Sequence, residues 1–332
     1  MPPKKGKSKA KIVEAYDGFS APVSLLMKEF KTRIASAAIS ENAALPIIKA
    51  LELPPEQPLT QLVVGDPVGL DCVRELCNVI HDFYYTKLRS VCFWNAHLND
   101  AGCAEICNSI VYIPSLQKLE IHNCGFGCVS ASALSSSLRS SRSKFLRTIS
   151  LAHNCTLNDD AVAALIPGTA LNKNLRTLDL SFGSLTSRSG SSLAQLLKGP
   201  YSRLRSLNVE GNRLGSDGIL ALADGLINSR TLEVVNMANN CTDVTHVDAM
   251  QAIAEVMVGN PTLTQIDLDG NLLNDESVSL LLSAVLKAKH IRKLILSHLG
   301  SPELVKVIGA ELQTRKSPGK KSAKKGKKKG KK

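Results

Sequence analysis

The sequence predicts an α/β solenoid, a curved horseshoe with a parallel β-sheet on its concave face and helices on its convex face. Eight Leu/Ile-rich segments begin 28 to 31 residues apart, at Leu88, Leu116, Leu146, Leu175, Leu204, Leu232, Leu263 and Ile291. Each opens a frame that is apolar at positions 1, 4 and 6. Self-similarity at such a period indicates stacked repeats. We expect a ninth, degenerate copy to begin at Leu59.

Each frame predicts one strand and one helix. Positions 1, 4 and 6 of a short strand face inward, and an Asn at position 9 turns the chain, as in the copy Leu204, Leu207, Val209 and Asn212. The second half predicts an amphipathic helix, and 215–218 offers turn and capping residues ahead of it. Copies stacked side by side give one parallel sheet.

Non-repetitive segments flank the frames. We expect a lysine-rich disordered tail at 1–11, a helical N-terminal cap at 12–58, the solenoid at 59–315 and a second disordered tail at 316–332. Helical spacing in the cap is carried by Val23, Leu26, Met27, Phe30, Ile34 and Ala37, and a second short helix by Ile47, Ile48 and Leu51. Such a cap covers the leucines that an open solenoid end exposes. At the other end a closing helix is predicted from Leu304, Val307, Ile308 and Leu312.

The period and the helix entry at 98–107 resemble the ribonuclease-inhibitor type of leucine-rich repeat, over roughly 59–312. Ala96 and Gly183 replace the Asn of position 9, so the frame predicts these two turns less firmly than the others. The resemblance implies a horseshoe that holds protein partners, although a minority of the family stimulates GTPases. A possible axonemal or flagellar member is suggested by the Lys-Lys-Gly-Lys character of the chain ends.

Charge is concentrated in the tails. The chain carries a net charge of +12, but residues 1–11 hold five lysines, 316–332 hold ten, and neither stretch has an acid, which leaves the body slightly negative. The densest run contains Lys324, Lys325, Lys327, Lys328 and Lys329. Without Arg or aromatic residues its binding would be sequence-blind. Acidic protein surfaces such as tubulin tails are the first expected target, nucleic acid is secondary, and no membrane role is expected.

Outward positions of the predicted strands form a polar, mildly acidic face. The partner-binding candidates on it are Trp94, Glu120, His122, Asp179, Glu210, Asp267 and Asp269. We interpret this face as a docking surface for a basic or hydrogen-bonding protein partner; a hydrolytic carboxylate pair is the sharper alternative. A second column, at position 2, contains Arg89, Arg147, Arg176, Arg205 and Arg292. It either covers the strand entrance with its aliphatic stems or binds anions.

Nine cysteines allow two interpretations. Cys103, Cys107, Cys124 and Cys128 could form a four-thiolate zinc site, but the repeat frame places most of them where small apolar core residues belong. The sequence holds no phosphate loop, nucleophile elbow or zinc-helix motif. We therefore predict no catalytic residue, no cofactor and no metal.

Two functions remain open. The first is a non-enzymatic interaction scaffold on a cytoskeletal or axonemal assembly, placed in the cytoplasm or in a cilium or flagellum. The second is a nuclear or ribonucleoprotein-associated adaptor that uses its lysines on phosphate. A GTPase-regulating repeat protein is a further alternative. Secretion and membrane insertion are not expected, since no apolar run approaches the length of a membrane span.

Overall fold

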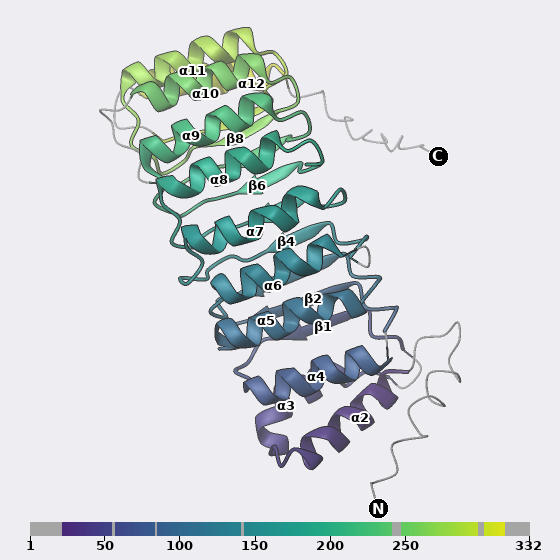
Figure 1. Ribbon diagram of the computed structural model, residues 1–332. Helices are drawn as coiled ribbons and strands as arrows, with labels where there is room; N and C mark the ends of the chain where they lie inside the picture. Colours follow the sequence, from purple (N-terminus) through teal and green to yellow (C-terminus); the bar gives the residue numbers. More distant parts are fainter. Residues whose placement is uncertain are drawn as a thin grey trace, which may run out of the picture.

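The computed structural model describes residues 22–54, 57–83, 85–140, 143–240, 247–297 and 302–315. Nine strands form one parallel sheet in sequence order, and helices pack along its convex face (Figure 1). The predicted horseshoe is thereby confirmed. Both lysine-rich tails lie outside the described residues. Within the described part no helix has the length and apolarity that a membrane crossing requires.

The strands are short and in register. They are β1 Gln61–Val64, β2 Ser90–Trp94, β3 Lys118–His122, β4 Thr148–Ser150, β5 Thr177–Asp179, β6 Ser206–Asn208, β7 Val234–Asn236, β8 Gln265–Asp267 and β9 Lys293–Ile295. β1 pairs with β2 from Gln61 opposite Ser90 to Val64 opposite Phe93, so the ninth copy expected at Leu59 is confirmed.

The helices follow the strands and lie side by side. They are α2 Val23–Ser36, α3 Glu41–Leu51, α4 Leu70–Phe83, α5 Asn99–Ser109 with a 3-10 turn at Ile110–Tyr112, α6 Cys128–Arg139, α7 Asp159–Leu171, α8 Ser187–Lys198, α9 Gly215–Asn228, α10 Val247–Gly259, α11 Asp275–Lys287 and α12 Pro302–Gln313. In the expected copy, Ile219, Leu222 and Leu226 are fully buried against the strands. Aliphatic side chains from both layers form one continuous core.

Two helices precede the first strand. Val23, Leu26, Phe30 and Ile34 of α2 are buried, and α2 packs on α3 and α4 while α3 also contacts β1. Arg33 fixes α2 to α4, because its guanidinium pairs with Asp82 and approaches Glu75 at 3.8 Å. The end of the stack at β1 is thus covered by apolar side chains, and the ion pair of Arg33 holds α2 on α4. The domain limits drawn from the sequence stay predictions.

At the other end α12 closes on α11. Ile308 and Leu312 are buried, but Val307 is half exposed, so its expected place in the closing face is wrong. The packed stripe also includes Val305 and Leu304, and position 307 falls on the opposite side of that stripe. Arg315 completes the contact, since its guanidinium donates to the carbonyls of Val285, Ala288 and Ile291 at 2.6 to 2.9 Å.

Position-9 asparagines hold successive repeats together. Buried Asn154 accepts from the backbone amides of Cys124, Gly125 and Phe126 at 2.9 to 3.0 Å through Oδ1. Its Nδ2 donates to carbonyls on both sides, including that of Ile121 at 2.7 Å in the preceding strand. Bonds of the same kind to the preceding strand are made by Asn212, Asn240 and Asn271. Each side chain therefore completes the turn of the repeat before its own.

The repeats with Ala96 and Gly183 at position 9 close their turns by other means. The amide of Gly183 donates to Oδ1 of Asn212 at 3.1 Å, so the next repeat serves it. Gly183 has no side chain that could accept the amides of the preceding turn. That turn closes internally instead, because the amide of Leu157 donates to the carbonyl of Asn154 at 3.0 Å. At Ala96 the carbonyl accepts from the amide of Val68 at 3.1 Å.

Two aspartates cap the helix of the following repeat. Asp100, in the first turn of α5, accepts from the amides of Gly127, Val129 and Ser130 at 2.8 to 2.9 Å, which are free donors at the start of α6. Burial opposes ionisation of Asp100, but the bonds from Ser130, Val129 and Gly127 outweigh it and lower the pKa of the carboxyl. Asp159 binds the start of α8 in the same way, through the amide of Thr186 at 2.8 Å.

Replacing Asn154 with Ala should lower the free energy of unfolding by about 2 to 4 kcal/mol, because several buried backbone groups lose their only polar partner. Urea unfolding followed by circular dichroism measures this. Asn78→Ala is the matched control: Asn78 makes only two long bonds, of 3.4 Å, to Glu75, and its change should stay within about 0.5 kcal/mol. Equal effects of the two variants would contradict the role assigned to Asn154.

Asp100→Asn should destabilise the protein by about 1 to 2 kcal/mol at pH 7, the usual worth of a helix cap. Since the folded-state pKa of Asp100 lies below its ordinary value of 3.8, the carboxylate stabilises the fold above that value and loses this effect as pH falls through the folded pKa. The difference between wild type and variant should therefore shrink below about pH 4.

Unfolding series between pH 3 and 7 test this expectation. Asp217→Asn, at an exposed position in the first turn of α9, provides the comparison. A wild-type advantage over Asp100→Asn that is constant across the series would exclude the charged cap.

Candidate functional site

The concave face is built from the outward positions of the strands. In each strand positions 4 and 6 are buried, and positions 3, 5 and 7 point away from the helices. The ladder pairs Cys92, Glu120, Ser150, Asp179, Asn208, Asn236, Asp267 and Ile295 across β2 to β9. The position-5 column expected from the frame is therefore one continuous row, with Trp94 opposite His122 beside it.

Asp and Asn side chains in this row accept hydrogen bonds from the backbone. Oδ1 of Asp179, Asn208, Asn236 and Asp267 each accepts from the amide two residues later, at 3.0 Å. The cause lies in the position-9 asparagines, whose Nδ2 takes the carbonyl that this amide would bind if the ladder continued. Asx at position 5 accepts the displaced amide. Asx residues at position 5 carry this signal in the sequence, where the strand pattern alone assigns them only to the outward face.

A hydrogen-bonded chain crosses three strands. Nε2 of His122 lies 2.8 Å from Oγ of Ser150, which donates to Asp179 at 3.1 Å, and Asp179 accepts from Oγ of Ser181 at 2.6 Å. Burial lowers the pKa of His122, and nearby acids only partly oppose this. These residue types suggest a nucleophile triad, but Ser150 stands between the other two and gives its proton to the carboxylate. The arrangement orients side chains and does not activate the serine.

The remaining acids lean apart. Glu210 accepts from Nδ2 of Asn236 at 2.8 Å, toward β7, while Asp179 is held toward β4. The structure thus does not bring Asp179 and Glu210 together. Glu120 pairs with Lys118 of its own strand at 2.9 Å. Asp267 is half-buried at the end of β8, and Asp269, two residues later, is exposed.

Trp94 lies at the N-terminal end of the face and is 50% exposed. Its indole rests on Gly65, because a Cβ at that glycine would lie 2.3 Å from Nε1. One side of the ring is therefore supported by backbone and the other is open. Such a fixed, half-exposed aromatic suits an interface anchor, since little side-chain entropy is lost on binding.

A further column, at position 8, is not predicted by the apolar frame. Its residues adopt left-handed backbone angles, with φ from 48° to 67°: Asn95, Asn123, His153, Phe182, Gly211, Asn239 and Gly270. Neighbours contact one another along the edge of the face, since Asn123 donates to Asn95 at 2.6 Å and His153 stacks on Phe182 with ring centroids 4.5 Å apart. Asn or Gly at five of the seven positions is the signal that could have predicted the column.

The cysteines belong to the core. Cys103, Cys107 and Cys124 are buried, and burial raises their thiol pKa values, that of Cys124 to about 11. Cys128 is exposed. A zinc site needs thiolates held together, and the described residues contain no group of three or more His, Cys, Asp or Glu placed to hold a metal. The core interpretation therefore fits these positions, and the four-thiolate interpretation does not.

Known proteins that are similar to this chain in sequence also contain leucine-rich repeats. A family model described as Leucine Rich repeat matches residues 171–194 and 203–223. Leucine-rich repeat-containing protein 73 of Homo sapiens is 29% identical over 251 residues, which cover 73% of this chain and 76% of the relative. The Ribonuclease inhibitor of Sus scrofa is 29% identical over 203 residues, or 58% of this chain and 41% of that protein.

A solved structure titled Leiomodin-1 Actin-Binding Site 2 overlays on 56% of this chain and 88% of its own, with a TM-score of 0.37 and 11% identity. That likeness is too distant to bear on function. The period, the strand-and-helix frame and the sequence relatives agree with one another: the chain folds as a leucine-rich repeat solenoid, and ribonuclease inhibitors are among the proteins that it is similar to.

Proposed function

We propose that this protein is a non-enzymatic scaffold that docks a basic protein partner on its concave face and works within a cytoskeletal assembly such as a ciliary or flagellar axoneme. The observation that carries the proposal is the continuous row of polar side chains at position 5 from β3 to β8, which are held in place by hydrogen bonds or an ion pair. The relatives support a binding role, since leucine-rich repeat proteins of this kind typically act as protein-binding scaffolds.

The row is a preorganised surface. Because Asp179, Asn236 and Asp267 already bond to backbone amides, their orientation is set before a partner arrives, and less entropy is lost on binding. Oδ1 is the atom used inside the fold, and a carboxylate has further lone pairs for an incoming donor. With Glu210, Asp269 and the indole of Trp94, this surface offers negative charge and one aromatic anchor.

The lysine-rich tails would assist by long-range attraction. Ten lysines in 316–332 give a salt-sensitive affinity for acidic protein surfaces such as glutamate-rich tubulin tails. The same lysines favour the second candidate, a nuclear or ribonucleoprotein-associated adaptor that binds nucleic acid nonspecifically. The two candidates differ in which part of the chain is essential: the concave face in the first and the tails in the second.

In the scaffold, Trp94→Ala should weaken retention of the tagged protein on detergent-extracted axonemes by about 10- to 100-fold, because loss of a buried aromatic anchor costs about 2 kcal/mol or more. Asp267→Lys should do likewise by placing a cation against a basic partner. Quantitative imaging against microtubule and DNA markers measures the retained fraction. Removal of 316–332 should only reduce it.

The matched controls lie off the face. Phe145→Ala removes an aromatic side chain of 55% exposure, and Asp248→Lys reverses a charge on exposed α10; both should be retained like wild type. Full release on tail removal, with Trp94→Ala unaffected, would reject the scaffold. Nuclear retention that nuclease abolishes would establish the adaptor instead.

A further inference from the structure

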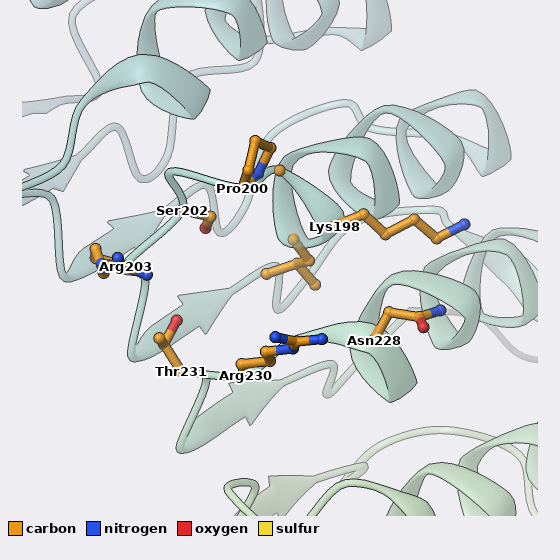
Figure 2. Close-up of a pocket in the computed structure, with 9 residues that line it drawn as sticks. Lys198, Pro200, Ser202, Arg203, Asn228, Arg230 and Thr231 are labelled. Carbon is orange, nitrogen blue, oxygen red and sulfur yellow. The ribbon is translucent and has the colours of Figure 1, made fainter.

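One linker between helix and strand is longer than its neighbours. Residues 199–205 connect α8 to β6, whereas 229–233 connect α9 to β7. Between the two linkers and the helix ends that precede them lies a cleft of about 800 Å³ (Figure 2). It is lined by Leu197, Lys198, Gly199, Pro200, Ser202, Arg203, Asn228, Arg230 and Thr231.

The lining carries three cations and no acid. Lys198 pairs with Asp224, which lies outside the lining. Arg203 and Arg230 are exposed, and neither makes an ion pair with any residue in the described part of the chain. In Figure 2 their side chains come from the two different linkers and lie on different sides of the cleft. Two guanidinium groups are thus available to an incoming anion.

The cleft adjoins the arginine column of position 2. Burial lowers the pKa of Arg176, and the positive charges of Arg205, Arg147 and Arg203 lower it further, so Arg176 lies within electrostatic reach of each of these three guanidinium groups. Arg176 uses Nη1 on the carbonyls of Lys173 and Leu175, as expected for a residue that covers the strand entrance. Arg176 therefore stabilises its own linker, and the column as a whole places positive charges on consecutive linkers.

Like charges held close together repel unless an anion joins them. Guanidinium groups match carboxylates in pairs of parallel hydrogen bonds. Because the cations sit on successive linkers and not around one point, they suit an anion whose charges are spread along a chain. Leu197, Pro200 and nearby Tyr201, which is 45% exposed, add apolar contact area.

Arg205 already pairs with Glu233 at 3.1 Å, so its charge is partly compensated. We propose that the cleft at 197–203 and 228–231, together with Arg176, binds an acidic peptide segment of a partner protein, a run of Asp or Glu side chains. This site lies at the N-terminal ends of the strands, away from the row at their C-terminal ends, and it does not depend on the concave face. The chain would then hold two partners of opposite charge.

The test is binding of a fluorescein-labelled peptide of ten glutamates to the full chain, measured by fluorescence anisotropy. Arg203→Glu/Arg230→Glu should weaken binding at least tenfold. Arg188→Glu/Arg213→Glu makes the same change in net charge at the opposite ends of α8 and β6, and it should weaken binding less than twofold. The control loses the exposed pair of Arg188 with Asp160, which is worth little, and the attraction of Arg188 to Asp159. Trp94→Ala should leave peptide binding unchanged.

Several outcomes would overturn the proposal. An equal loss in both double variants would assign binding to the tails and the net charge, and absence of wild-type binding would remove the site. Displacement of the peptide by millimolar inorganic phosphate would indicate a single-anion pocket. Variant-sensitive binding of single-stranded RNA without peptide binding would indicate nucleic acid. Should the Glu variant melt early, Arg203→Gln/Arg230→Gln must still lose affinity, with an unchanged melting temperature.

Discussion

The fold depends on a side chain that replaces a backbone group. At position 9 the amide of Asn154, Asn212, Asn240 or Asn271 takes the carbonyl of the preceding strand just where the parallel ladder ends. This substitution ends each strand after a few residues and lets the chain turn toward its helix. It also frees an amide two residues beyond position 5, and an Asp or Asn there accepts it. The shape of the solenoid and the composition of its concave face thus have one origin.

The sequence predicts the layers of this fold because the period and the apolar positions report directly on burial. Strand register, the copy at Leu59 and the helix with Ile219 and Leu222 all follow from that pattern. The exposure of Val307 does not follow from it, because apolar residues in α12 allow more than one buried face, and only the packing against α11 decides which face that is. Contacts between repeats, such as that of Asp100 with the start of α6, join residues about 30 positions apart, and a frame read one copy at a time does not contain them.

The candidate site shows the same division. Its columns could be predicted, and the placement of Trp94 opposite His122 agrees with the frame. The directions of the side chains could not: Asp179 and Glu210 are neighbours in the pattern yet are held toward different strands by Ser150 and Asn236. The cleft beside Arg203 was also missed, because it arises from a longer linker, and linkers fall between the positions that define a frame.

Dependence of each turn on the next repeat also sets the unit in which such a chain can change length. If a segment from one position-9 asparagine to the next is deleted, the backbone amides and carbonyls on both sides of the junction keep an asparagine partner. A deletion that begins within a frame leaves buried amides without a hydrogen-bond acceptor. Gain or loss of one such unit moves everything beyond it by one strand spacing, about 4.8 Å. Trp94 on β2 and Asp267 on β8 are six strand spacings apart. Evolution can therefore change the distance between this aromatic side chain and the acidic end of the face only by whole strand spacings.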